Sequence, residues 1–472
     1  MSTNEHHMDW PPSEPKIVKD ELIQTTVKGS SFFKKLASIT AILGILGLIG
    51  LLGKFFLDGN DQTQWGYIAA SLAFIFSVTG GAPMVAIAPF IAKANWARPV
   101  SRIAHVIGAS GVLINIIIMI PLLWMLPPLV VEGARRRSIW FEAPVYSPHF
   151  WDFLSLIMLA IAGIGLLYVS ALPDFALMRD NSSGFRKKLG NFLAGGFIGT
   201  TVQWSTLRMR VGIMSTLYFF IYIFVHVVIS IDFSLSMVPG WRDAIYPMSH
   251  AMGGIQGGVA LVIILAWIVR KYGNYDNYLN INVFWALGRL MFATSLMWIY
   301  FFYSAFIVFW YGKSMSDIAW LDLLIRGPMM YVFFLGMLFS FILPWWWLIW
   351  NKVRNSINGP FIGACIALIG VFFERIRLYV PAWSVDPKLI HDKWLSVIPE
   401  TLYPDIWDIL TILGSAGAVV LVLIAITRIM PIIGVWEVQQ FNLLATPVKY
   451  IKANGIRAVS YTHLTLPTNR EV

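Results

Sequence analysis

Ionisable side chains fall inside several long apolar runs of the sequence, where a charge is costly and therefore points to function. Asp152 opens one such run, His226 and Asp232 share a later one, and Glu374 and Arg377 share another. Carboxylates and histidines can accept and release protons. The chemistry that these residue types allow is proton transfer, or the binding of a ligand that exchanges protons.

Each of these residues also has a structural interpretation. Glu374 and Arg377 are three residues apart, so they can form an ion pair on one face of a helix. His226 and Ser230 are four apart and can satisfy each other by a hydrogen bond. Asp152 stands at the start of its run, where a carboxylate favours the positive end of a helix dipole. The sequence leaves both interpretations open.

The sequence does not support a metal or haem site. The one cysteine, Cys365, lies inside an apolar run and excludes both an internal disulfide and a cluster ligated by several cysteines. A b-type haem would need two axial ligands, and the only candidate pair, His226 and His250, is expected at different depths in the membrane. No nucleotide-binding or zinc spacing is present. We therefore expect no metal, haem or iron–sulfur cluster in this chain.

The elements that must position these residues are transmembrane helices. Of the 472 residues, 57% are hydrophobic and only 13% are charged, whereas soluble domains carry roughly 25% charged residues. Apolar runs of about 20 residues recur along the chain, and each can cross a bilayer as a helix. The sequence predicts an all-α, polytopic membrane protein of about ten spans. They are expected near residues 36–57, 67–92, 103–126, 150–171, 211–238, 245–269, 282–311, 328–350, 359–380 and 406–430.

The predicted spans divide the chain into a polar N-terminal tail (1–35), a membrane domain (36–430) and a C-terminal tail (431–459). Ten spans place both termini on one side. The short loops on that side hold more Lys and Arg than the loops on the other side, although the run Arg135–Arg137 opposes this bias. The bias favours cytoplasmic termini. Membrane topology explains the Lys and Arg residues of the short loops, and so the net charge of +10 does not indicate nucleic-acid binding. The expected partner is the lipid bilayer. Residues 460–472 resemble a translated sequencing adapter and are excluded from functional reasoning.

Short motifs follow one another in a characteristic order between residues 140 and 440. They are Trp151–Phe153, Leu172–Asp180, Val225–Phe233, Pro239–Pro247, Phe373–Arg375 and Tyr403–Asp405. In this order the chain resembles the NrfD-like membrane subunits of the polysulphide-reductase type, most closely the larger such subunit of alternative complex III.

The resemblance implies ten helices, arranged as two four-helix bundles with peripheral helices. It implies a subunit of a respiratory or photosynthetic electron-transfer complex in the inner (plasma) membrane. The implied partners are an extracytoplasmic iron–sulfur subunit, a multihaem cytochrome and further membrane subunits. It also implies a quinone or quinol site at the outer end of one bundle, with Asp152 as the catalytic, quinone-binding carboxylate. Such a chain is not an enzyme on its own.

Two positions depart from the family pattern. The histidine that family members with quinol activity carry near the outer end of the third span is Trp124 here. A second histidine, expected in the second span, is Gly80. Tryptophan cannot accept a proton. A quinone site formed by Asp152 and Trp124 would therefore be degenerate and would oxidise quinol slowly or not at all.

Two other functions remain open from the sequence. The chain could be a non-catalytic membrane scaffold of the same complex, with a proton path through His226, Asp232, Glu374 and Arg377. It could also be a transporter of another class. Transporters often contain inverted repeats and broken helices, and neither is apparent in the sequence.

Overall fold

A computed structural model of the chain describes residues 19–22, 30–138, 147–400, 402–445, 447–450 and 453–456. Among these residues, nine helices are long and apolar enough to cross a membrane. A tenth long helix, α16 (Asn358–Trp383), carries Glu374, Arg375 and Arg377 and packs among them. The all-α, polytopic architecture is confirmed. The nine are Ser31–Asp58, Gln62–Ile91, Arg98–Met125, Pro148–Asn181, Thr201–Met237, Tyr246–Gly273, Ile281–Gly312, Met330–Leu348 and Ile406–Ile429.

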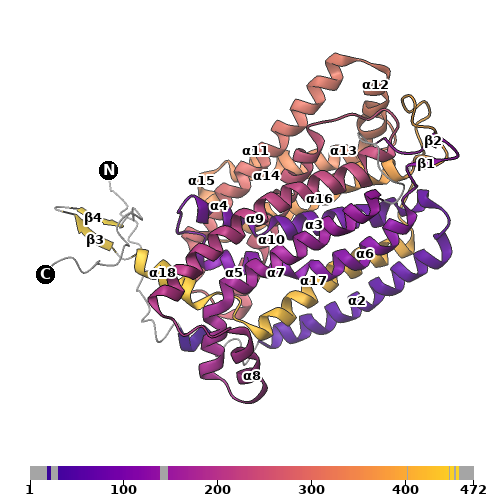
Figure 1. The fold of residues 1–472 in the computed structure, drawn as a ribbon. Coiled ribbons are helices and arrows are strands. Elements are labelled where there is room, and N and C mark those ends of the chain that lie inside the picture. The colour runs from indigo at the N-terminus through magenta and orange to yellow at the C-terminus, as the bar shows by residue number, and fades with distance from the viewer. Residues whose placement is uncertain are drawn as a thin grey trace.

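Two four-helix bundles lie side by side (Figure 1). In the first, α7 (Ser147–Asn181) and α9 (Thr201–Phe233) pack with the second and third spans. The second bundle contains α10 (Tyr246–Gly273), α11 (Ile281–Gly312), α16 and the eighth span. The eighth span consists of α13 (Met330–Met337), a π-helical segment (Leu338–Ile342) and α14 (Leu343–Leu348). Contacts of α3 with α10 and α16 join the bundles.

The second and third spans each break midway. The second consists of a 3-10 turn (Gln62–Trp65), α3 (Gly66–Gly81) and α4 (Met84–Ile91), with Pro83 at the break. The third consists of α5 (Arg98–Ser110) and α6 (Val112–Met125), separated by Gly111. The two breaks are neighbours, because a Cβ on Gly111 would lie 2.2 Å from Thr79 Oγ1 on α3.

The first and last spans, α2 (Ser31–Asp58) and α17 (Ile406–Ile429), pack against each other as a peripheral pair. A Cβ added to Gly47 would stand 2.6 Å from Gly414 Cα, so only glycines permit this close approach. At one end of the pair the buried Lys54 ammonium lies 2.7 Å from Asp405 and 3.2 Å from Asp408. This network compensates a charge that would be costly to bury alone.

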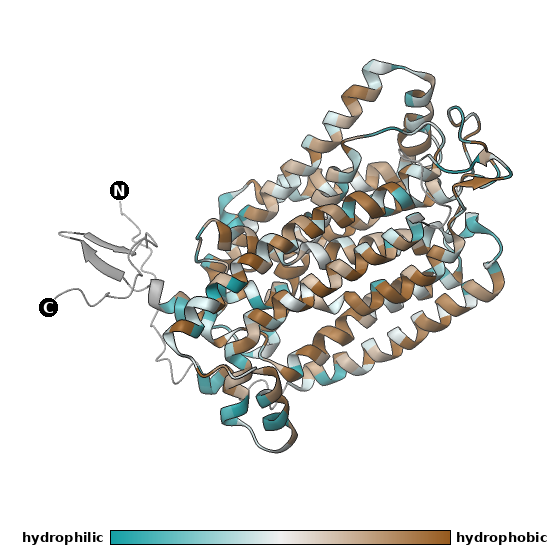
Figure 2. Ribbon diagram, in the orientation of Figure 1, coloured by the Kyte–Doolittle hydropathy of each residue, from teal (hydrophilic) through white to brown (hydrophobic). Residues whose placement is uncertain are grey.

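The two ends of the molecule carry different short elements (Figure 1). One end carries the hairpin of β1 (Val130–Val131) and β2 (Ala134–Arg135) and the helix α12 (Met315–Leu321). The other carries α8 (Gly184–Leu193), α15 (Asn351–Arg354) and α18 (Val435–Ala445). Hydrophilic residues gather toward both ends, and apolar residues dominate between them (Figure 2). We call these the β-hairpin end and the α18 end.

The predicted C-terminal tail, 431–459, contains more structure than the sequence indicated. Helix α18 packs on the bundle, where Glu437 lies 3.2 Å from the Arg102 guanidinium. Beyond it, β3 (Pro447–Tyr450) and β4 (Ala453–Ile456) pair antiparallel, with Pro447 opposite Ile456. Residues 1–18 of the N-terminal tail and the adapter-like segment 460–472 lie outside the described residues.

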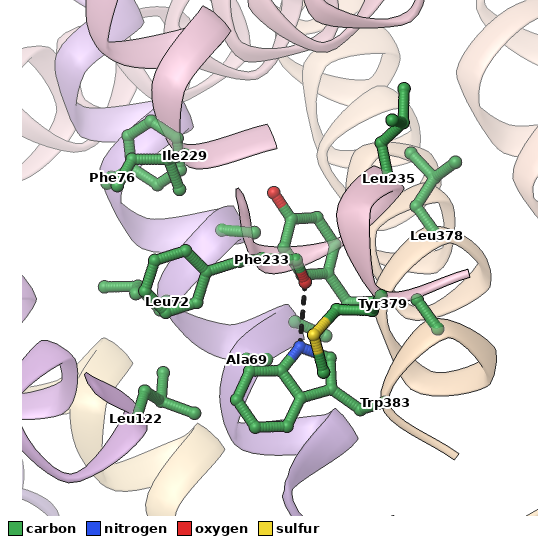
Figure 3. Close-up of a cluster of buried hydrophobic side chains, with 14 of the residues drawn as sticks. Ala69, Leu72, Phe76, Leu122, Ile229, Phe233, Leu235, Leu378, Tyr379 and Trp383 are labelled. Carbon is green, nitrogen blue, oxygen red and sulfur yellow. Dashed lines mark hydrogen bonds between the residues drawn. The ribbon is translucent and has the colours of Figure 1, made fainter. Parts of the chain in front are cut away.

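Apolar side chains from both bundles meet in one buried cluster toward the β-hairpin end (Figure 3). The Trp383 indole donates a 2.8 Å hydrogen bond to the Phe233 carbonyl, which ties α16 to the end of α9. The cluster fixes the ends of the helices that carry the ionisable residues. Its labelled members are Ala69, Leu72, Phe76, Leu122, Ile229, Phe233, Leu235, Leu378, Tyr379 and Trp383.

Candidate functional site

A carboxylate site lies at the β-hairpin end of the first bundle. Asp152, in the second turn of α7, is completely buried. Its carboxyl group feels the charges of Asp232, near the end of α9, and of Arg137. Neither carboxylate oxygen of Asp152 meets a hydrogen-bond donor among the described residues. Two acids and one arginine therefore share a buried space, and we call Asp152, Asp232 and Arg137 the carboxylate site.

Arg137 links this site to the loop that follows the β-hairpin. Its Nη2 donates a 2.7 Å hydrogen bond to the Asp232 carbonyl and lies 3.7 Å from the Asp232 carboxylate. Its Nε donates to Ser236 Oγ at 3.2 Å. The guanidinium is completely buried. Its charge offsets part of the negative charge that two ionised carboxylates would bring into the protein.

A pair of carboxyl groups can form a hydrogen bond with each other only when one of them holds a proton. The carboxylate site therefore contains side chains of a type that can carry a proton. His149 lies one turn before Asp152 on α7, hydrogen-bonds the Leu126 backbone and feels the charges of Arg137 and Asp232. A second proton-exchanging side chain therefore adjoins the pair.

A loop from the second bundle covers this end. The His391 amide donates to the Arg135 carbonyl at 2.9 Å, and the His391 ring lies 3.0 Å from Ser138 Oγ. Burial and the nearby charges of Arg137 and Arg136 lower the pKa of His391 to about 4. His391 is therefore neutral at physiological pH, and its neutral ring can accept the hydrogen bond from Ser138.

Trp124 does not occupy the space beside Asp152. Its side chain is 77% exposed on the outer surface of α6, whereas Leu122 and Met125 on the same turn are buried. The structure therefore does not bring the Trp124 indole into the buried space around Asp152, because the tryptophan points to the outer surface of its helix. Asp152 meets Asp232 and Arg137 instead.

Gly80 lies inside the first bundle, near the break of the second span. The Tyr218 hydroxyl donates to its carbonyl at 2.8 Å. A Cβ at Gly80 would stand 3.3 Å from the Tyr222 ring and 3.4 Å from Leu159. These side chains fill the space that a histidine at this position would need.

The two histidines expected at different depths instead pack together in the interior. The rings of His226 and His250 lie 5.3 Å apart, and Phe76 packs against both. His226 Nδ1 hydrogen-bonds the Tyr222 carbonyl at 2.9 Å. The predicted bond between His226 and Ser230 is absent, since Ser230 Oγ has no partner among the described residues.

Two side chains of α16 complete this histidine cluster. The Tyr379 hydroxyl lies 3.0 Å from His250 Nε2. The Arg375 guanidinium donates to the His250 carbonyl at 2.7 Å and to Ser77 Oγ at 3.3 Å. All of these groups are buried. The cluster of His226, His250, Arg375 and Tyr379 is thus a polar network inside the apolar core.

Glu374 and Arg377 form the predicted buried ion pair, with Arg377 Nε donating to Glu374 Oε2 at 3.1 Å. The pair faces the eighth span, because Gly336 lies beside the Glu374 carboxylate. Arg375 faces α3 and α10 instead. The residues of the predicted proton path therefore fall into three groups. These are Asp232 in the carboxylate site, His226 in the histidine cluster, and the Glu374–Arg377 pair on another face of α16.

In the part of the chain that the structure describes, no group of three or more His, Cys, Asp or Glu side chains is placed to hold a metal ion. Arg137 and His149 are not among the site residues predicted from the sequence. The signal for Arg137 was present, because the run Arg135–Arg137 opposes the charge bias of the other loops.

The fold and these buried groups define a class, a polytopic α-helical membrane protein with a buried carboxylate site near one end. Comparison with known proteins does not narrow that class, because no protein-family model matches the sequence and no curated protein matches it significantly.

Proposed function

We propose that this chain is the integral membrane subunit of an electron-transfer complex, respiratory or photosynthetic, with a quinol site at the β-hairpin end. On this proposal both termini lie in the cytoplasm and the β-hairpin end faces outward from the inner (plasma) membrane. An iron–sulfur subunit and a multihaem cytochrome dock on that outer end, beside further membrane subunits. The order of the sequence motifs supports the class of complex.

The single observation that carries the quinol site is the buried Asp152 carboxylate, which meets no hydrogen-bond donor among the described residues and lies near the Asp232–Arg137 pair. Oxidation of a quinol to a quinone releases two protons and two electrons. The carboxylate pair accepts one proton, and His149 is the adjacent group that can take the second. Both electrons pass to the cofactors of the extracytoplasmic partner. Asp152 is the group that we assign to the quinol hydroxyl.

The position of Trp124 changes the expected activity. Slow or absent turnover was expected because an indole would stand where a proton acceptor is needed. The exposure of Trp124 on the outer surface of α6 argues against that reason. The proton acceptors of the proposed site are the two carboxylates and His149.

A second candidate function is supported by the histidine cluster. His226, His250 and Tyr379 are buried groups of types that can exchange protons, and the Arg375 guanidinium holds the His250 backbone between the two bundles. On this alternative the chain is a scaffold of the same complex that conducts protons and oxidises no quinol.

The deciding experiment is purification from the native membrane, followed by a quinol-oxidation assay. We expect cofactor-bearing subunits to co-purify, and Asp152→Asn to abolish quinol oxidation without dissociating them. The matched control is Asp243→Asn. Asp243 is another buried acid at this end, but its carboxylate only accepts backbone hydrogen bonds from Ile245 and Tyr246, which Asn can also accept. Full turnover in Asp152→Asn would reject the quinol site.

A further inference from the structure

A cavity of about 370 Å³ opens at the α18 end of the first bundle. Its walls come from α4, from the first turns of α5, from the start of α9 and from α18. It is separate from the carboxylate site, because Asp152 lies at the start of α7 whereas this cavity reaches Ser170, five turns further along that helix.

Three cations line the cavity where spans leave the apolar part of the fold. Lys93 follows the end of the second span, Arg98 begins the third, and Arg208 lies in the second turn of α9. Lys93 and Arg208 are exposed. Arg98 is half-buried and is held by a 2.6 Å hydrogen bond to Gln440 of α18. Positive charge is thus concentrated at one level of the cavity.

Apolar side chains form the rest of the wall. Phe90, Ile91 and Val211 line the cavity with the cations, and the Ile91 side chain is exposed. The cavity therefore joins a cationic level to an apolar wall. This is the arrangement that suits a phospholipid, with its anionic headgroup at the membrane surface and its acyl chain beside the helices.

Among the described residues, one acidic side chain lines the cavity. Glu437 lines the cavity, but its carboxylate lies 3.2 Å from Arg102. Arg102 also pairs with Asp174 at 2.7 Å. One buried arginine therefore faces two carboxylates, and the Glu437 carboxylate is directed toward Arg102.

We propose that this cavity binds one anionic phospholipid. Its phosphate lies on Lys93, Arg98 and Arg208, and an acyl chain lies along Phe90 and Ile91. The lipid would fill the space between α4, α9 and α18 and so hold α18 against the bundle. This site does not depend on the proposed quinol chemistry.

The test is native mass spectrometry of the detergent-purified, delipidated protein, titrated with phosphatidylglycerol. We expect one molecule to bind at lower concentration than all others. The double variant Lys93→Gln/Arg208→Gln should weaken that first binding step about 30-fold, from the usual contribution of each cation near a lipid headgroup. Ala94→Trp, which fills the cavity without changing charge, should also abolish it.

The matched control is Lys187→Gln/Arg210→Gln. Both residues are exposed cations near the α18 end, and neither lines the cavity. An equal loss of affinity in this control would overturn the proposal, as would equal binding of phosphatidylcholine. Competition by inorganic phosphate at matched concentration would show that the site takes a free anion and would also overturn the lipid assignment.

Discussion

Asp152 and Asp232 approach each other from neighbouring helices, and both lie next to the guanidinium of Arg137. A carboxylate this deeply buried requires compensation, since burying an unpaired charge costs several kcal/mol. One arginine compensates one of the two acids. The other must share a proton with its neighbour or meet a ligand that brings a hydrogen-bond donor. A quinol hydroxyl is such a donor, and this requirement links the geometry to the proposed reaction.

The first prediction distinguishes the role of Asp152 in quinol turnover from that of Trp124. Because Trp124 is exposed on the outer surface of α6, Trp124→His should leave quinol turnover in the purified complex within about twofold of the natural protein. The measurement is steady-state quinol oxidation, with Asp152→Asn as the variant that should lose activity. A large gain of turnover in Trp124→His would show that the indole reaches the site after all.

The second prediction concerns the packing of the first and last spans. Gly47→Ala should lower the thermal midpoint, because its Cβ would stand 2.6 Å from Gly414 Cα and force the helices apart. Overpacking of this kind typically costs about 1–3 kcal/mol. Gly44→Ala is the matched control, since its Cβ would meet Ala418 Cβ at an ordinary 3.6 Å. Thermal unfolding in detergent should distinguish the two variants, and equal midpoints would contradict the close packing.

The helices could be predicted from the sequence because apolar runs of span length have only one stable backbone arrangement in lipid. Each predicted span overlaps one of the ten long helices. The ends of the helices were harder to predict than their existence. The first helix begins at Ser31, five residues before the predicted span, because Ser30 caps it by accepting a hydrogen bond from the Phe32 amide. The midway breaks at Pro83 and Gly111 had sequence signals that hydropathy alone does not weigh.

The site was harder to predict, because it depends on which way each helix faces. Asp152 was identified correctly as a buried acid, and the pairing of Glu374 with Arg377 followed from their spacing. Arg137 lies in a loop that folds back into the protein, and no local pattern encodes that return. Trp124 was misplaced for a related reason. In a helix that is apolar on every face, periodicity does not say which face meets the core.

The third prediction is a pH dependence of the loop 384–400. The pKa of His391 is about 4 in the folded protein, below the value of about 6.5 that histidine has when unfolded. The neutral ring is therefore favoured by folding, and its contribution to stability is complete above pH 6.5. That contribution falls as the pH drops from about 6.5 toward 4.

Hydrogen–deuterium exchange of this loop, measured between pH 4 and 7 and corrected for the intrinsic rate, should show increasing exposure at the acidic end. His391→Asn is the control, because its amide oxygen can accept the Ser138 hydrogen bond but does not titrate. A loop that opens over the same pH range in His391→Asn would exclude His391 as the group responsible.

The last prediction concerns the buried pair of Glu374 and Arg377. Their side chains hydrogen-bond at 3.1 Å and are both buried, so Glu374→Ala leaves an uncompensated guanidinium in the interior. Such a loss typically costs about 3–5 kcal/mol, and thermal unfolding should show it. Glu400→Ala, at an exposed loop position, should change stability by at most about 0.5 kcal/mol.

The double variant Glu374→Leu/Arg377→Met replaces both charges with apolar groups and should recover most of the lost stability. Proton uptake and quinol turnover measured on that double variant then separate two roles. Recovery of stability together with activity means that the pair is structural, whereas recovery of stability without activity assigns it to the proton path. Equal stability and activity of Glu374→Ala and Glu400→Ala would show that the Glu374–Arg377 pair contributes neither to stability nor to a proton path.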